Sequence, residues 1–379
     1  MKTLSIVDDE RAFAEFIAEV ASGLNYETRI AESSRSFLTG GRQAWPSVLL
    51  LDLQMPDVDG IEMLRELGRL GCTSKVILAS GMDARVLHAA AQVGKTAGLQ
   101  IAGMLEKPVR VATVRDMLNR LRDDKVDWTA DELAHAIEFD ELFLEYQPIV
   151  RIQTRQMVGV EALVRWRHAS GRVIPPMEFI PLAEASGLID RLTEWVIETA
   201  LGQVGEWWRR GIALHISINV SALNIRNREF PDRIAALCQQ MGVAPDWVTF
   251  ELTETASTRD PDALIEILGR IRVKGFHLSI DDFGTGYSSV AQLLRLPFSE
   301  MKIDRSFIAE VHSKQDSEIV SRTLVGMARD LGLKAVAEGV DSKEALHRLR
   351  EWGCPLAQGF LFSRPVSAAA IEAFGQEML

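Results

Sequence analysis

The first third of the chain alternates short apolar runs with longer amphipathic stretches. Five runs have the length and character of buried strands: Thr3–Val7, Thr28–Ile30, Val48–Leu51, Val76–Ala79 and Gly98–Leu105. Stretches with helical spacing of apolar positions lie between them, such as Arg11–Leu24 and Gly60–Leu70. Strands that alternate with helices in this way predict a doubly wound (βα)5 domain of the α/β class, built on a parallel sheet.

A second and longer series of apolar runs begins near residue 130. The strand candidates are Leu142–Val150, Met157–Val164, Leu214–Val220, Val248–Leu252, His277–Ile280, Glu300–Ile303, Lys334–Ala337 and Leu356–Leu361. Helical patterns separate most of them, for example Ala183–Gly202 and Ser317–Leu331. Strands alternating with helices over about 250 residues predict a (β/α)8 barrel of the TIM type.

The two series imply two domains and a connection between them. We expect an α/β domain over residues 1–122, a linker over 123–130 and a barrel over 131–379. The stretch Arg122–Asp127 is polar and charged and contains neither glycine nor proline. That composition favours a stiff joint over a flexible one, and it is equally compatible with a continuation of the preceding helix.

Composition narrows the class of protein. The hydrophobic fraction of 47% and the charged fraction of 25% are typical of a globular protein, and the net charge of -11 argues against general nucleic-acid binding. Neither a secretory apolar segment nor a membrane-spanning run is expected. The cysteines Cys72, Cys238 and Cys354 form no zinc or disulfide pattern. We therefore expect a cytoplasmic protein with neither DNA nor a membrane as a partner.

Five polar groups follow the predicted strands of the first domain. Asp8 and Asp9 follow the first strand, Asp52 the third, Ser80 the fourth and Lys107 the fifth. The carboxyl ends of parallel strands meet at one edge of a sheet, so these groups predict an acyl-phosphate site. Asp52 is the expected nucleophile toward phosphorus, and Asp8, Asp9 and Asp52 would surround one Mg2+. Lys107 and the Ser80 hydroxyl would contact the phosphoryl oxygens.

These residues resemble the receiver domain of two-component response regulators. The segments that carry the resemblance are Val7–Asp9, Asp52–Gly60, Ser80 and Lys107–Pro108. The resemblance implies phosphoryl transfer from a cognate histidine kinase to Asp52, and a cis peptide bond before Pro108. Met104 stands where the family usually has an aromatic switch residue. The usual rotameric switch is therefore not implied.

Polar side chains also end successive strands of the second domain. They are Glu161, Asn219, Glu251, Asp281, Asp282, Lys302, Glu338 and Gln358. Active sites form at the C-terminal end of such barrels, and carboxylate and amide oxygens suit Mg2+ or Mn2+ rather than zinc. The adjacent Asp281 and Asp282 predict a pair of ions suited to phosphodiester hydrolysis. Glu338 would take the proton of the catalytic water, and Lys302 would steady the nucleophile.

The second domain resembles the EAL-type cyclic di-GMP phosphodiesterases. The matching segments are Tyr146–Val150, Glu161–Arg165, Asn219–Ser221, Glu251–Glu254, Asp281–Ser289, Lys302–Asp304, Ala337–Val340 and Gln358–Phe360. The resemblance implies that Glu161, Asn219, Glu251 and Asp281 ligate one metal ion, and that Asp281 and Asp282 serve a second. The implied product is linear 5′-pGpG. Asp341 and Phe360 depart from the family's usual Glu and Tyr, outside the implied ligand set.

The same resemblance implies roles for the surrounding residues. Glu338, Lys302 and Glu161 are the implied catalytic groups. Four residues are implied to contact the dinucleotide: Gln147, Leu163, Arg165 and Gln358. Glu254 is implied to support the loop Gly284–Ser289. Members of the family tend to dimerise, so we expect a homo-oligomer formed through the barrel domains.

The sequence thus predicts a response regulator that hydrolyses cyclic di-GMP, with activity modulated by receiver phosphorylation. The alternative is a binding module that holds the dinucleotide or a protein partner without turnover. Degenerate members of the family lose metal ligands, the general base or the loop after the paired aspartates, and this chain keeps them. A DNA-binding output is disfavoured because no basic helix-turn-helix module is present, and a cyclase because no Gly-Gly-Asp-Glu-Phe segment occurs.

Overall fold

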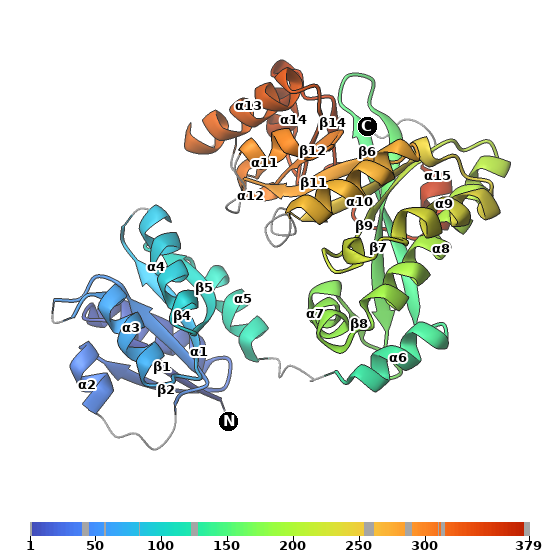
Figure 1. Cartoon of the computed structure of the whole chain (residues 1–379). Helices are drawn as coiled ribbons and strands as arrows, with labels where there is room; N and C mark the ends of the chain where they lie inside the picture. The colour runs from blue at the N-terminus through green and yellow to red at the C-terminus, as the bar shows by residue number, and fades with distance from the viewer. Residues whose placement is uncertain are drawn as a thin grey trace. The chain divides into compact units, whose positions relative to one another are not determined.

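The computed structural model describes residues 2–39, 45–56, 58–82, 84–122, 128–253, 261–284, 290–309, 311 and 315–374. The chain forms two compact units, residues 1–127 and 128–379, which run from blue to cyan and from green to red in Figure 1. Residues 123–127 lie outside the described part, so the stiffness and the limits of the linker stay predictions.

The first unit is a parallel sheet with helices on both faces (Figure 1). Its strands follow the order β2-β1-β3-β4-β5, and every pair is parallel. The strands are β1 (Lys2–Val7), β2 (Tyr26–Ala31), β3 (Val48–Asp52), β4 (Lys75–Ser80) and β5 (Gln100–Glu106). The helices are α1 (Arg11–Ser22), α2 (Ser34–Thr39), α3 (Gly60–Arg69), α4 (Ala84–Thr96) and α5 (Val111–Arg122). The predicted doubly wound α/β domain is confirmed.

Alternation along the central strand β3 divides the core of the first unit into two layers. Leu49 and Leu51 pack with α3 and α4 on one face, whereas Val48 and Leu50 pack with α1 and α5 on the other. Successive residues of a strand point to opposite faces, so a strand covered on both sides must be apolar throughout. This arrangement leaves Asp52 at the carboxyl end of the strand as its first polar side chain.

The second unit is a closed barrel of eight strands. The order around the barrel is β6-β14-β13-β12-β11-β10-β9-β7, and β6 pairs with β7 to close it. The strands are β6 (Leu142–Arg151), β7 (Gln156–Arg167), β9 (His215–Asn219), β10 (Val248–Thr253), β11 (His277–Phe283), β12 (Glu300–Ile303), β13 (Lys334–Ala337) and β14 (Leu356–Ala357). A short strand, β8 (Val173–Ile174), pairs with the outer end of β7. The TIM-like barrel is confirmed.

The helices of the second unit follow the strands around this barrel (Figure 1). They are α6 (Ala130–Glu138), α7 (Pro176–Ser186), α8 (Ile189–Arg209), α9 (Phe230–Met241), α10 (Pro261–Val273), α11 (Val290–Arg295), α12 (Arg305–Ile308), α13 (Gln315–Asp330), α14 (Lys343–Glu351) and α15 (Ala368–Ala373). Short 3-10 turns lie at Asn224–Arg226 and Pro245–Trp247. None of the helices in the described ranges has the length and apolar character needed to cross a bilayer.

One strand of the barrel is reversed. β6 runs antiparallel to both of its neighbours, β7 and β14, whereas the other pairs around the barrel are parallel. A parallel pair needs a long crossover, but only residues 152–155 separate β6 from β7, so the two strands form a hairpin. Hydrophobic alternation defines the faces of a strand and not its direction, and the sequence pattern therefore did not show this reversal.

Two predicted elements are wrong in extent. The predicted helix Ala183–Gly202 is broken, because α7 ends at Ser186 and α8 begins at Ile189. Gly187 between them has φ +76°, a left-handed conformation that ends an α-helix. The predicted strand Leu356–Leu361 is only two residues long, because the chain leaves the barrel after Ala357.

Candidate active site

Lys302 lies inside the barrel near the carboxyl end of β12, and its side chain is 1% exposed. Its Nζ lies 2.7 Å from Glu338 Oε1 and 2.8 Å from Glu251 Oε2. The same atom lies 3.3 Å from Glu161 Oε2 and 3.5 Å from Asp281 Oδ1. Each carboxylate comes from a different strand or from its end. The structure thus brings four of the sequence-predicted acids together around one ammonium group.

The balance of charge in this cluster is negative, and the pKa values reflect it. Burial raises the pKa of Glu338 to about 8, and the charge of Lys302 offsets only part of that shift. Burial also raises the pKa of Glu251 well above its usual range, with Glu161 and Asp281 adding to the effect. Burial alone would lower the pKa of Lys302, but the surrounding carboxylates outweigh it and raise that pKa. Buried carboxylates in excess of cations create a site for further positive charge.

The donors of the cluster fit divalent metal ions. Glu251 Oε1 is buried and makes no hydrogen bond within the part of the chain that the structure describes. Asp281, Asp282 and Glu338 each offer a carboxylate oxygen, and these three atoms lie within 4.8 Å of one another. All of these donors are hard oxygen atoms, which suit Mg2+ or Mn2+. An unpartnered buried oxygen beside this cluster is the observation that supports a metal site.

Asp282 reaches the cluster because the strand is irregular at this point. The pairing of β11 with β12 shifts register between Ile280 and Phe283, and Asp282 adopts φ +54°. A bulge of this kind re-aims a side chain, so two consecutive residues can reach one site instead of facing opposite sides of the sheet. Burial and the neighbouring charge of Asp281 raise the pKa of Asp282 to about 6.

Three amide side chains extend the cluster: Asn219 from β9, Gln147 from β6 and Gln358 directly after β14. Asn219 Nδ2 donates to Glu161 Oε1 at 2.7 Å, and Gln358 Nε2 donates to Glu161 Oε2 at 2.6 Å. Gln358 Nε2 also donates to Gln147 Oε1 at 2.8 Å, and Gln147 Nε2 donates to the Ser363 carbonyl oxygen at 3.2 Å. Burial opposes ionisation of Glu161, but Lys302 and these amides outweigh it, so the pKa of Glu161 is lowered. Glu161 is therefore a fixed, ionised carboxylate.

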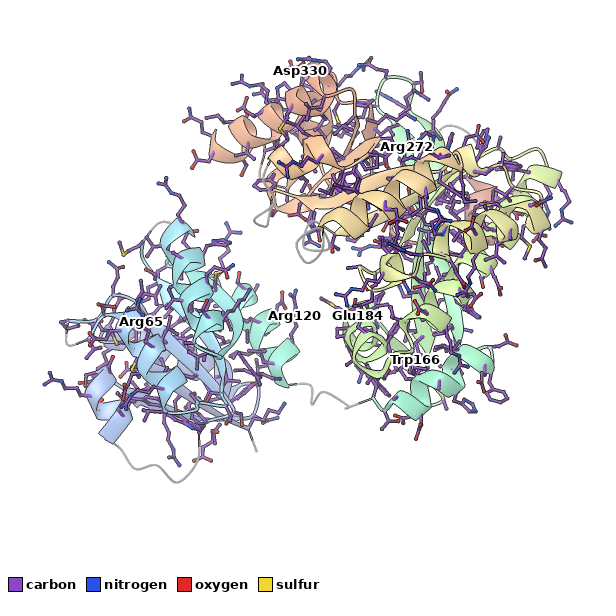
Figure 2. The ribbon with its side chains drawn as sticks, viewed as in Figure 1. Arg65, Arg120, Trp166, Glu184, Arg272 and Asp330 are labelled. Atoms are coloured by element: carbon purple, nitrogen blue, oxygen red, sulfur yellow. The ribbon has the colours of Figure 1, made fainter. Side chains whose placement is uncertain are left out.

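A cavity of about 970 Å3 opens beside the cluster. Leu163 and Asn219 belong to its wall, together with Pro176 and Glu184 of α7 and Arg226. Glu184, labelled in Figure 2, accepts a hydrogen bond from Ser221 Oγ at 2.6 Å. Such a volume suits a ligand of nucleotide size, and the shared residue Asn219 joins the cavity to the carboxylates.

Arg165 lies on the same strand as Glu161, four residues further on. Its Nε donates to Glu145 Oε2 at 2.9 Å, and its Nη1 donates to the Val164 carbonyl oxygen at 2.9 Å. Sequence reasoning placed Arg165 at the site but missed Glu145. The pairing of Glu145 with Leu163 across β6 and β7 reveals it, and that register was not visible in the sequence.

The first unit holds a second acidic cluster at the carboxyl edge of its sheet. Lys107 Nζ lies 2.9 Å from Asp8 Oδ2 and 2.9 Å from Asp52 Oδ2, and both aspartates are buried. Asp8, Asp9 and Asp52 offer oxygens within 4.8 Å of one another. Burial would lower the pKa of Lys107, but hydrogen bonds to Asp52 and Asp8 raise it. The ammonium also lies 4.2 Å from the ring centroid of Phe13, a contact that the sequence did not reveal.

Ser80 lies at the same edge, at the end of β4. Its Oγ contacts Gln54 Oε1 at 3.5 Å and accepts a hydrogen bond from the Met82 backbone N–H at 3.0 Å. The Lys107–Pro108 peptide bond is cis, as the receiver resemblance implied. The predicted receiver residues therefore meet at one edge. Glu254, the predicted support of the loop after Asp282, lies outside the described residues.

Comparison with known proteins finds a family for each of the two units. The EAL domain model matches residues 130–365, and the model of the response regulator receiver domain matches residues 4–119. The cyclic di-GMP phosphodiesterase RocR of Pseudomonas aeruginosa is 32% identical over 329 residues, which cover 84% of this chain and 84% of RocR.

Two further relatives match the barrel. The cyclic di-GMP phosphodiesterase NbdA of the same organism is 42% identical over 245 residues, which cover 64% of this chain and only 31% of NbdA. The solved structure of the phosphodiesterase PaMucR in complex with c-di-GMP is 40% identical, with a TM-score of 0.61, over 64% of this chain and 98% of that chain. This chain belongs to the EAL domain family and carries a response regulator receiver domain ahead of its EAL domain.

Proposed function

We propose that this chain is a response regulator that hydrolyses cyclic di-GMP to linear 5′-pGpG, with activity modulated by phosphorylation of Asp52. One observation carries the enzymatic part: four carboxylates from separate strands surround the buried Lys302 beside a cavity of nucleotide size. The named activities of RocR and NbdA support the reaction, and the c-di-GMP complex of PaMucR supports the substrate.

Two divalent cations, Mg2+ or Mn2+, belong to the proposal. Glu161, Asn219, Glu251 and Asp281 would hold one, and Asp281 with Asp282 would hold the other. The unpartnered Glu251 Oε1 supports this assignment. When bound, the ions would polarise a phosphoryl oxygen and acidify a water molecule.

The protein's own groups then have separate tasks. Glu338 accepts the proton of the attacking water, and added positive charge in the cluster lowers its pKa and favours the carboxylate form. Lys302 stays protonated, fixes the Glu338 carboxylate through its 2.7 Å contact and stabilises negative charge at the nucleophile. Arg165, Gln147 and Gln358 hold the dinucleotide by hydrogen bonds, and Leu163 packs against it.

The receiver domain is the site of the proposed regulation. Asp52 accepts a phosphoryl group from a cognate histidine kinase. Lys107 already bridges Asp8 and Asp52, so its ammonium is in place to offset the charge of a phosphoryl oxygen. Asp8, Asp9 and Asp52 would hold one Mg2+, which would offset the negative charge of the phosphoryl group. A homo-oligomer formed through the EAL domains would connect the two activities.

A hydrolysis assay on the full chain tests the enzymatic part. Purified protein is incubated with cyclic di-GMP and Mg2+ or Mn2+, and chromatography resolves the substrate from pGpG. We expect metal-dependent pGpG formation, and a loss of about 10²–10⁴-fold in kcat for Glu338→Gln with retained substrate binding. A wild-type chain that binds cyclic di-GMP but releases no pGpG with either metal would instead be a binding module.

A further inference from the structure

Arg165 is held by a carboxylate that lies outside the cluster around Lys302. Glu145 Oε2 accepts from Arg165 Nε at 2.9 Å, and the Val164 carbonyl oxygen accepts from Arg165 Nη1 at 2.9 Å. Two contacts at different nitrogens fix both the position and the plane of a guanidinium group. Within the described ranges, no hydrogen bond of the protein engages Nη2, so this end of the group keeps its donors for a ligand.

The hairpin of β6 and β7 creates this pair. Its antiparallel register places Gln147 opposite Glu161, Glu145 opposite Leu163 and Phe143 opposite Arg165. Glu145 is therefore the diagonal neighbour of Arg165, a spacing that long side chains bridge. Alternation also places the side chains of Glu145 and Gln147 on the same face of β6. This face lies toward the acidic cluster, because Gln147 Oε1 and Glu161 Oε2 accept hydrogen bonds from the same Gln358 Nε2.

The location of Glu145 is unexpected for a site that binds an anion. The chain already has a net charge of -11, and a further carboxylate beside Arg165 repels a phosphodiester. The side chains of Arg165 and Glu145 are 17% and 31% exposed, so solvent screens this repulsion only in part. A free arginine, however, loses rotamer entropy when it binds, and a held arginine loses less.

We infer that Glu145 is a positioning residue, which holds the Arg165 guanidinium in place for a phosphate of the cyclic dinucleotide. The inference rests on the proposed substrate. Two effects of Glu145 oppose each other: its charge weakens substrate binding, and its hydrogen bond to Arg165 strengthens it. The larger of these two effects decides whether KM for cyclic di-GMP rises or falls when Glu145 is replaced.

Two substitutions separate these effects. Glu145→Gln removes the charge and keeps an oxygen acceptor for Arg165 Nε, whereas Glu145→Ala removes both. We expect Glu145→Ala to raise KM for cyclic di-GMP about tenfold with little change in kcat, in line with the loss of one charge-assisted hydrogen bond. We expect Glu145→Gln to keep KM near the wild-type value. A KM that falls or stays unchanged in Glu145→Ala would overturn the inference.

A double-mutant cycle with Arg165→Ala tests whether Glu145 acts through Arg165. In the Arg165→Ala background, Glu145→Ala should not raise KM further, because the group that Glu145 positions is gone. Removal of the repulsive carboxylate should there leave KM unchanged or lower it. A full additional rise in KM in that background would contradict the positioning role. Glu351→Ala is the matched control, because it breaks a Glu–Arg ion pair on α14 and should leave KM unchanged.

A binding measurement separates failure of this inference from failure of the proposed reaction. Calorimetric titration of cyclic di-GMP with Mg2+ is performed in the Glu338→Gln background, where turnover is impaired. We expect Glu145→Ala to weaken this binding about tenfold, in parallel with its KM. Normal affinity in Glu145→Ala overturns the positioning role even if the wild type is active. Weakened affinity together with an inactive wild type upholds the role and rejects only the hydrolysis.

Discussion

The Lys302 ammonium lies 2.7 Å from Glu338 Oε1 and is the shared counter-ion of four carboxylates in the barrel. Lys302→Met removes that counter-ion without a large change in side-chain volume. We expect the metal-free variant to lose about 3–5 kcal/mol of unfolding free energy, as for a buried ion pair that loses one partner. Urea unfolding in a chelator, followed by tryptophan fluorescence, measures this loss.

Fluorescence suits this experiment because all tryptophans except Trp45 lie in the second unit. Below neutral pH the loss should shrink, since the raised pKa values of Glu338 and Glu251 favour their protonation and so reduce the repulsion among the carboxylates. A Lys302→Met protein as stable as the wild type at pH 8 would contradict the counter-ion role.

We expect His215, the first residue of β9, to make the stability of the barrel depend on pH. Its ring stacks on Trp247 with centroids 4.4 Å apart, and burial together with the charges of Lys334, His277 and Arg151 lowers its pKa from 6.5 to about 4. In the unfolded chain the same group binds a proton near pH 6.5. Its contribution to stability is therefore complete above pH 6.5 and is lost as pH falls toward 4.

Thermal unfolding between pH 7.5 and pH 4.5 measures this contribution. His215→Gln should lose less stability than the wild type over that interval, because it has no proton to bind. His347→Gln serves as the control, since His347 is 71% exposed on α14 and should leave the wild-type slope unchanged. An identical slope in His215→Gln and the wild type would reject the prediction.

Gly339 directly follows Glu338 and has φ +64°, and a Cβ at this position would lie 2.4 Å from Arg305 Cβ. We expect Gly339→Ala to lower the unfolding free energy by about 1–3 kcal/mol, because both the backbone and the space oppose a side chain. Turnover should fall as well, since the strain displaces Glu338. Chemical unfolding and the hydrolysis assay together test this.

Gly202→Ala is the matched control. Gly202 lies within α8, and a Cβ there meets nothing within 4 Å. The substitution should raise the unfolding free energy by about 0.5–1 kcal/mol, because alanine loses less backbone entropy in a helix than glycine. If Gly339→Ala and Gly202→Ala changed the unfolding free energy in the same direction, local backbone geometry would not explain the effect of Gly339→Ala.

We expect Asp52 to be the residue that a small phosphoryl donor phosphorylates. Wild-type protein incubated with acetyl phosphate and Mg2+ should acquire one base-labile phosphoryl group, which phosphate-affinity electrophoresis detects as a mobility shift. Asp52→Asn should show no shift, because an amide is no nucleophile toward phosphorus. Persistence of the shift in Asp52→Asn would place the modification on another residue.

Much of the site could be predicted because strand ends are visible in a sequence. Glu161, Glu251, Asp281 and Glu338 each stand within or directly after an apolar run. Parallel strands bring such positions to one end of a barrel, so their convergence on Lys302 follows from topology alone. The receiver acids Asp8 and Asp52 meet Lys107 for the same reason.

The remaining features depend on register, direction and backbone geometry. The Glu145–Arg165 pair exists only because β6 and β7 form a hairpin with one particular register. Asp282 joins the acids through a bulge, and Gly187 divides a helical pattern that is continuous in its apolar spacing. These features arise from contacts between distant segments or from single dihedral angles, which hydrophobic periodicity does not encode.

Because β6 is reversed, the turn between β6 and β7 lies at the end of the barrel opposite the carboxylates. Gly159 of β7 pairs with His215, the first residue of β9, so the preceding turn leaves the barrel where the parallel strands begin. Gln153, Thr154 and Arg155 in this turn are exposed. A peptide tag inserted there should be tolerated, and a fluorophore carried by it would report on the enzyme from the end opposite the carboxylates.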